Sequence, residues 1–141
     1  MSAILIRIVV PISFVLLLVS VTEAGILHHK VHVEAINWLL DSKDLTLHCY
    51  ERKGEDLGEH TIHPNEKYTF VFRPRFIGKS SKYYCSFKWD GSNLKWFDLY
   101  SQGRDYKDCR NCSWVVKSME ICRLDYKYGG SVGAYTLCFP F

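Results

Sequence analysis

Apolar and polar side chains alternate along several short stretches of this chain, most clearly between residues 82 and 100. In the first half of that stretch, one face would carry only aromatic side chains and a cysteine, namely Tyr83, Cys85, Phe87 and Trp89. Because successive side chains of a strand point to opposite faces of a sheet, this period of two predicts a half-buried strand. Turn-forming residues at 90–93 and a second strand at 94–100 complete a predicted β-hairpin. A lone hairpin is only marginally stable in water, so its aromatic side chains require a second layer.

The same alternation predicts further short strands on both sides of the hairpin. We expect them at residues 31–35, 45–49, 68–72, 112–116, 121–126 and 132–139, with a shorter one at 60–62. Polar stretches that contain glycine separate them and predict loops, above all at 51–59, 73–82 and 101–110. We expect seven or eight of these stretches to form short antiparallel strands. Without a helical segment they predict an all-β fold, either a small barrel or, as we expect here, a β-sandwich.

The first 24 residues differ in character from the rest. Arg7 precedes an apolar run at 8–21, and Thr22-Glu23-Ala24 offers small residues at the positions that signal peptidase reads. A membrane anchor would need about 20 uninterrupted apolar residues, whereas Pro11 and two serines interrupt this run. We therefore predict a cleaved signal peptide at 1–24 and a secreted protein. Removing 24 of the 141 residues leaves 117, which suits one domain at 25–141.

The charge balance narrows the range of partners. Eighteen Lys and Arg residues against fifteen Asp and Glu residues give a net charge of +3, which suits an acidic extracellular partner. No long run of basic residues supports nucleic-acid binding. No second apolar run has the length to span a membrane, so we expect no stable membrane insertion.

All six cysteines lie after residue 24: Cys49, Cys85, Cys109, Cys112, Cys122 and Cys138. An even number in a short secreted chain indicates up to three disulfides, whose pairing the sequence alone leaves open. The Cys-x-x-Cys pair at 109 and 112 could instead be a redox site, but such pairs act where they open a helix after a strand. This pair follows a polar loop and precedes a strand, so we favour structural disulfides.

Seven short motifs occur in one order along the chain. They are His48-Cys49, Asp56-Leu57-Gly58-x-His60, Tyr68-x-Phe70-x-Phe72, Cys85-x-Phe87-x-Trp89, Phe97-Asp98-x-Tyr100, Arg104-Asp105 and Cys109-x-x-Cys112-x-Trp114. Together they resemble the plant self-incompatibility protein family, also called the S-protein homologues, over residues 31–122. The resemblance implies a small secreted β-sandwich with disulfides. The founding members of that family are stigma-secreted ligands that a pollen membrane protein recognises.

Cys49 and Cys85 lie on strand faces with apolar neighbours, as buried cross-links do. We expect them to pair with Cys109 and Cys112 in some order, which leaves Cys122 with Cys138. In this arrangement the disulfides hold two aromatic-rich sheets together. Each would contribute about 2–4 kcal/mol, mostly by restricting the unfolded chain.

The histidines raise two alternatives, a metal site and a ribonuclease. One group lies near the start and another at a predicted loop: His28, His29 and His32, then His60 and His63. Their positions at a terminus and across a loop favour exposed histidines over metal ligands. A secreted basic plant protein could use paired histidines as acid and base, but residues 62–64 resemble the plant S-ribonuclease histidine motif only faintly. We therefore predict a protein without a cofactor and without enzymatic activity.

Binding residues tend to lie on loops that a rigid scaffold positions, so we assign recognition to the loops at 51–59, 73–82 and 101–110. The candidate partner-binding residues are Arg73, Arg75, Lys79, Lys82, Arg104 and Asp105. Asp105 also fits a structural ion pair with Arg104, because burying a lone carboxylate is costly. Asn111-Cys112-Ser113 matches the N-glycosylation pattern, although a bonded cysteine in its middle position argues against occupancy.

The predicted function is that of a secreted, monomeric plant ligand that binds a membrane receptor or another extracellular protein. A secreted hydrolase, with ribonuclease as the form worth testing, is the alternative. A defence protein that damages microbial membranes fits less well, because an amphipathic basic helix is absent from the sequence.

Overall fold

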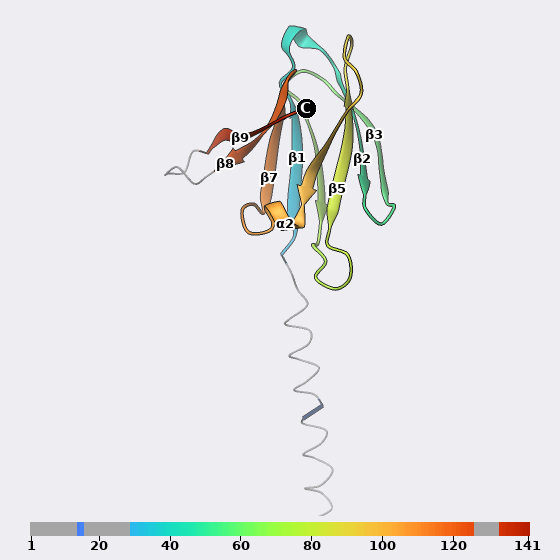
Figure 1. The fold of residues 1–141 in the computed structure, drawn as a ribbon, viewed down its shortest axis with the longest axis vertical. Helices are drawn as coiled ribbons and strands as arrows, with labels where there is room; N and C mark the ends of the chain where they lie inside the picture. Colours follow the sequence, from blue (N-terminus) through green and yellow to red (C-terminus); the bar gives the residue numbers. More distant parts are fainter. Residues whose placement is uncertain (1–13, 16–28, 126–132) are drawn as a thin grey trace, which may run out of the picture.

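The computed structural model describes residues 14–15, 29–125 and 133–141. In these ranges nine strands form two sheets that pack face to face (Figure 1). The strands are β1 (Val31–Asn37), β2 (Leu45–Glu51), β3 (Asp56–Ile62), β4 (Lys67–Phe72), β5 (Lys82–Lys88), β6 (Lys95–Ser101), β7 (Asn111–Val116), β8 (Glu120–Asp125) and β9 (Ala134–Pro140). Two short helical turns, η1 (Leu40–Ser42) and α2 (Gln102–Asp105), lie between them. The predicted all-β fold is confirmed.

One sheet has the strand order β4-β1-β7-β8-β9 and the other the order β3-β2-β5-β6. Neighbouring strands are antiparallel except β1 and β7, which run parallel, so the expectation of a wholly antiparallel fold was wrong. The loop expected at 51–59 was also wrong over most of its length, because β3 begins at Asp56. This strand lies at the edge of its sheet with mostly exposed or half-buried side chains, so its sequence lacks the apolar alternation of a buried strand.

The central hairpin is confirmed as β5 and β6. Its turn contains Gly91 at φ +77°, a conformation that favours glycine, and the hydroxyl of Ser92 donates to the Trp89 carbonyl at 2.9 Å. The pairing of β5 with β6 shifts register between Tyr83 and Tyr84. Near this irregularity Leu99 and Tyr100 are both fully buried although they are adjacent, which accounts for the imperfect alternation of the second arm.

The core lies between the sheets and is rich in aromatic rings. Val33 and Trp114 from one sheet and Leu47 and Phe87 from the other are all fully buried. Aromatic contacts join the layers, as between Phe97 and Trp114, whose ring centroids are 5.1 Å apart. The hydrophobic effect of this burial is therefore what holds the two sheets together.

All six cysteines form disulfides, and none of these disulfides connects the two sheets. The pair Cys122–Cys138 joins β8 to β9, as predicted. The pairing expected for the other four was wrong. Cys49 and Cys85 bond to each other, because they lie opposite each other on β2 and β5 with Cα atoms 4.0 Å apart. Cys109–Cys112 then closes the short segment that leads into β7.

The signal peptide predicted at 1–24 and the turn predicted at 127–130 lie outside the described residues, residues 14 and 15 excepted. Among the described residues, no helix has both the length and the apolar character that crossing a membrane would require.

Candidate partner-binding surface

Three connections between strands meet at one end of the sandwich. They are the β2–β3 turn, the β4–β5 loop and the segment that contains α2, which lie together at the lower end of the sheets in Figure 1. We call residues 51–55, 73–81 and 102–110 the loop end. Two of the predicted recognition loops, at 73–82 and 101–110, are thereby brought together, and only the turn at 52–55 remains of the third.

Hydrogen bonds join these connections into one surface. The Arg52 N–H donates to the Lys82 carbonyl at 2.9 Å, and the Gln102 N–H donates to the Ser81 carbonyl at 3.1 Å. The Gln102 side chain accepts from the Ser81 N–H at 2.8 Å and donates to the Arg75 carbonyl at 2.7 Å. The β4–β5 loop is therefore fixed on both sides, to the β2–β3 turn and to α2.

An ion pair between Glu51 and Arg75 anchors the same loop to the end of β2. The Glu51 side chain is only 2% exposed. Burial favours the neutral acid, but the Lys53 N–H, which donates at 2.6 Å, and the Arg75 guanidinium outweigh it and hold the pKa of Glu51 below its usual value. The Arg75 guanidinium therefore holds the β4–β5 loop in place through this ion pair.

A buried charge cluster supports the loop end from beneath. Asp105 is fully buried and pairs with Arg104 at 2.7 Å and with Arg123 of β8. Its carboxylate also accepts the Ser101 N–H at 2.9 Å. As folded here, Asp105 positions the segment 102–110 and does not reach the surface. Arg123, which sequence reasoning did not select, is 3% exposed and completes the cluster.

The other candidate residues differ in what they can offer to a partner. Lys79 and Arg73 are exposed. Lys82 forms an ion pair with Asp98 at 3.0 Å and is partly exposed. The Arg104 guanidinium lies 4.8 Å from the ring centre of Trp114 and donates to the Asp98 carbonyl at 2.7 Å, so only part of it faces solvent.

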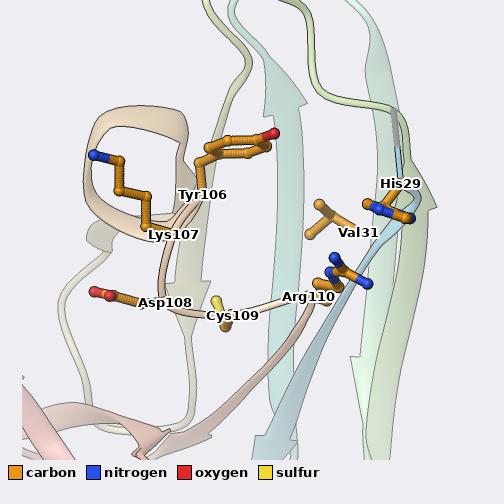
Figure 2. Close-up of a pocket in the computed structure, with 7 residues that line it drawn as sticks. All are labelled: His29, Val31, Tyr106, Lys107, Asp108, Cys109 and Arg110. Atoms are coloured by element: carbon orange, nitrogen blue, oxygen red, sulfur yellow. The ribbon is translucent and has the colours of Figure 1, made fainter. Parts of the chain in front are cut away.

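A hollow of about 300 Å³ opens beside α2 (Figure 2). It is lined by His29, Val31 and residues 106–110, and Figure 2 shows His29 and Arg110 next to each other on one side of it. This volume is at the lower limit of ligand pockets. Its charged lining residues are the cations Lys107 and Arg110 and the acid Asp108.

The loop end concentrates the positive charge of the chain. Residues 51–55, 73–81 and 102–110 contain eight Lys and Arg residues and four Asp and Glu residues, a net charge of +4, whereas the whole chain carries +3. Two of the four acidic residues, Glu51 and Asp105, are buried and paired with arginine. The exposed part of the loop end is therefore strongly cationic.

Sequence reasoning missed a second exposed surface, on the outer face of the β3-β2-β5-β6 sheet. Rings there lie side by side with centroids 4.3, 5.6 and 6.0 Å apart in the order His48, Tyr50, Tyr84 and Trp96. Trp96 is 54% exposed. The sequence did contain a sign of this surface, because Tyr84 and Trp96 lie on the outward-facing sides of the two hairpin strands, where polar residues are expected.

His48, His60 and His63 are the histidines that a ribonuclease activity would be tested on, and each of them has a different partner. His48 Nε2 lies 2.6 Å from Asp56, and His63 Nδ1 lies 2.8 Å from Asp44. His60 stacks on Tyr68 with centroids 4.0 Å apart. Since His48 pairs with Glu59 across the strands, the next residue, His60, points to the opposite face of the sheet.

Within the described ranges, one cluster has the composition of a metal site: Glu120, Cys122 and Cys138. Its two sulfur atoms form a disulfide, so no thiolate is available there as a ligand. At the glycosylation pattern, Asn111 is exposed, while the Ser113 hydroxyl is nearly buried and donates to Glu34 at 2.6 Å. Glycan attachment at Asn111 stays a prediction.

Comparison with known proteins identifies the family of this chain. The family model "Plant self-incompatibility protein S1" matches residues 32–140, which is most of the chain. The chain belongs to this family. The resemblance predicted from seven short motifs is thereby confirmed.

The relatives of this family member include three from Arabidopsis thaliana. S-protein homolog 5 is 38% identical over 103 residues, which cover 73% of this chain and 72% of the relative. S-protein homolog 29 is 32% identical, over 66% of this chain and 67% of the relative. S-protein homolog 20 is 31% identical over 96% of this chain and 92% of the relative.

Proposed function

We propose that this protein is a secreted, non-enzymatic recognition ligand whose loop end binds an acidic surface on an extracellular or membrane-receptor protein. Membership of the self-incompatibility family supports a role as an extracellular ligand. We assign binding to the loop end because its three connections form one cationic surface. The side chains of Gln102, Glu51 and Asp105 hold these connections in place.

A preformed surface of this kind favours binding for a physical reason. Ordering loops and long side chains on association costs free energy, and hydrogen bonds already made in the free protein remove part of that cost. The concentrated positive charge also steers an acidic partner toward this end, which raises the association rate at low salt. Affinity and rate should therefore both depend on the loop end.

We favour a ligand over a ribonuclease because His48, His60 and His63 contact different residues, namely Asp56, Tyr68 and Asp44. His48 and His60 point to opposite faces of one sheet, and His63 lies beyond the end of β3, which favours the ligand over a ribonuclease with paired acid and base histidines. No observation favours a second function over recognition.

The test compares two variants with equal charge change. Lys53→Glu, Lys79→Glu and Lys107→Glu together reverse one exposed lysine in each connection of the loop end. Lys43→Glu, Lys88→Glu and Lys95→Glu together make the same change at the opposite end of the sandwich. Saturable binding of the labelled, oxidised protein to plant protoplasts is measured for each.

We expect the loop-end variant to lose saturable binding and the opposite-end variant to keep it. Circular dichroism of both variants checks that the β fold is retained. Equal loss in both variants would mean that net charge alone governs binding, and full binding by the loop-end variant would refute the proposed surface.

A further inference from the structure

An apolar projection lies at the outermost part of the loop end. Ile77 is 92% exposed, the highest value for any large apolar side chain in the described part of the chain. Phe76 beside it packs edge to face against Tyr106, with ring centroids 4.8 Å apart. Two segments that are distant in sequence thus form one projection. We call Phe76, Ile77 and Tyr106 the apolar tip.

The fold holds this tip away from the rest of the molecule. The β4–β5 loop extends beyond the ends of the strands in Figure 1. Gly78 follows Ile77 with φ +78°, and a side chain at that position would meet nothing within 4 Å. The loop therefore turns at an open, solvent-facing position, which leaves the Ile77 side chain almost fully exposed.

The two segments that carry the tip, 73–81 and 102–110, contain six Lys and Arg residues and two Asp residues. Lys79, Lys107 and Arg110 are exposed. The segment 73–81 contains no acidic residue. In 102–110, Asp105 is fully buried, and Asp108 lies 3.5 Å from Arg123. The tip is therefore an exposed apolar group within segments whose exposed charges are mainly positive.

This arrangement matches the layers of an anionic bilayer. An aliphatic side chain such as Ile77 gains by entering the acyl region, whereas aromatic rings are enriched at the level of the headgroups. Lysine and arginine near the surface are attracted to anionic lipid.

We propose that the apolar tip docks the loop end peripherally on an anionic lipid surface, without spanning the bilayer. This inference rests on the proposed function and deepens it: the docked ligand would meet a membrane receptor with the loop end already facing the membrane. Ile77 and Phe76 enter the interface, and Lys79, Lys107 and Arg110 contact the headgroups.

Co-sedimentation with protein-free vesicles tests this proposal separately from receptor binding. The oxidised mature protein is mixed with vesicles of phosphatidylcholine alone and with vesicles that also contain phosphatidylserine. We expect binding to the anionic vesicles only, weakening as salt is raised.

Two matched pairs of variants locate the contact. Ile77→Ser should lower the vesicle partition coefficient about tenfold, because it removes an aliphatic side chain that is buried on docking. Leu40→Ser removes a side chain that is also highly exposed, 72%, at the opposite end and should leave the partition coefficient unchanged. Lys79→Glu should lower it about tenfold at low salt, whereas Lys88→Glu on β5 should not.

The absence of binding to anionic vesicles would overturn the membrane proposal while leaving the protoplast experiment free to support a protein partner. Equal binding to neutral vesicles, or equal loss in Ile77→Ser and Leu40→Ser, would also overturn it. Binding that appears only with native membrane vesicles, and that protease treatment of those vesicles abolishes, would assign the tip to a protein receptor.

Discussion

Replacing Asp105 by asparagine removes the buried negative charge between Arg104 and Arg123 beneath the loop end. The amide can still accept the hydrogen bond from the Ser101 N–H, so the change acts mainly on charge. Arg123 is 3% exposed and would keep its positive charge, with the Asp108 carboxylate 3.5 Å away. Leaving a buried charge without its partner is strongly destabilising.

The expected loss of stability is about 3–5 kcal/mol. For a domain of this size each kcal/mol corresponds to about 4 °C in the unfolding temperature, so Asp105→Asn should lower it by about 12–20 °C. Thermal unfolding of the oxidised protein, followed by circular dichroism, measures this directly. Asp90→Asn at an exposed turn is the control and should change stability by less than about 0.5 kcal/mol.

A second substitution separates lost charge balance from lost shape. Adding Arg123→Met to Asp105→Asn removes the orphaned charge and should recover part of the stability, since an apolar replacement of a buried pair is often tolerated. A loss of less than about 1 kcal/mol in Asp105→Asn would contradict a supporting role for the buried ion pair. So would a double variant whose loss of stability exceeds the sum of the losses in the two single variants.

Three further predictions concern Glu51, His63 and the disulfide Cys122–Cys138. Glu51→Gln should cost about 1–3 kcal/mol in urea unfolding. Because the pKa of Glu51 is lower in the folded protein, its contribution is present above its usual value of 4.5 and is lost as pH falls through the folded pKa, so variant and wild type should converge in acid. In an NMR titration His63 should show a raised pKa, because its hydrogen bond to the Asp44 carboxylate favours the imidazolium, and Asp44→Asn should lower that pKa. Replacing both cysteines of Cys122–Cys138, which are 16 residues apart, should cost about 3 kcal/mol.

Each of these predictions has an outcome that contradicts it. A constant stability difference between Glu51→Gln and wild type down to strongly acid pH would show that the carboxylate charge contributes nothing. An unchanged His63 titration in Asp44→Asn would remove Asp44 as the cause. Unaltered urea unfolding without Cys122–Cys138 would show that this disulfide does not stabilise the fold by restricting the unfolded chain.

The central hairpin could be predicted from sequence because its information is local. Alternating side chains, a turn with Gly91 and an even spacing of apolar residues all act within about 20 residues of one another. Of the β3 strand only the end, at 60–62, was predicted, and the reason is the opposite one. At the edge of a sheet, Glu59 and Thr61 face solvent and leave no apolar pattern to detect.

Long-range pairings were beyond local patterns. The parallel pairing of β1 with β7 places Val33 beside Cys112. The alternation within each strand does not predict which strand lies next to it. The disulfide between Cys49 and Cys85 follows from strand register, which sequence spacing leaves open.

The candidate surface was predictable in part. Polar loops identified two of its three connections, but not that all three meet at one end of the sandwich. Asp105 was correctly suspected of pairing with Arg104, whereas its second partner, Arg123, lies 18 residues further on and was not foreseen. The tip residues Phe76 and Ile77 resemble core residues in sequence, and only the fold shows them exposed.

The claim that the loop end is the recognition surface is tested most directly by photo-crosslinking on plant protoplasts. A photoreactive residue is placed at position 79 or 107 in one pair of proteins and at position 43 or 88 in a control pair. We predict that the first pair captures a membrane-associated protein, that excess unlabelled protein prevents the capture, and that the control pair captures nothing. Capture from positions 43 and 88, without capture from 79 and 107, would contradict the account.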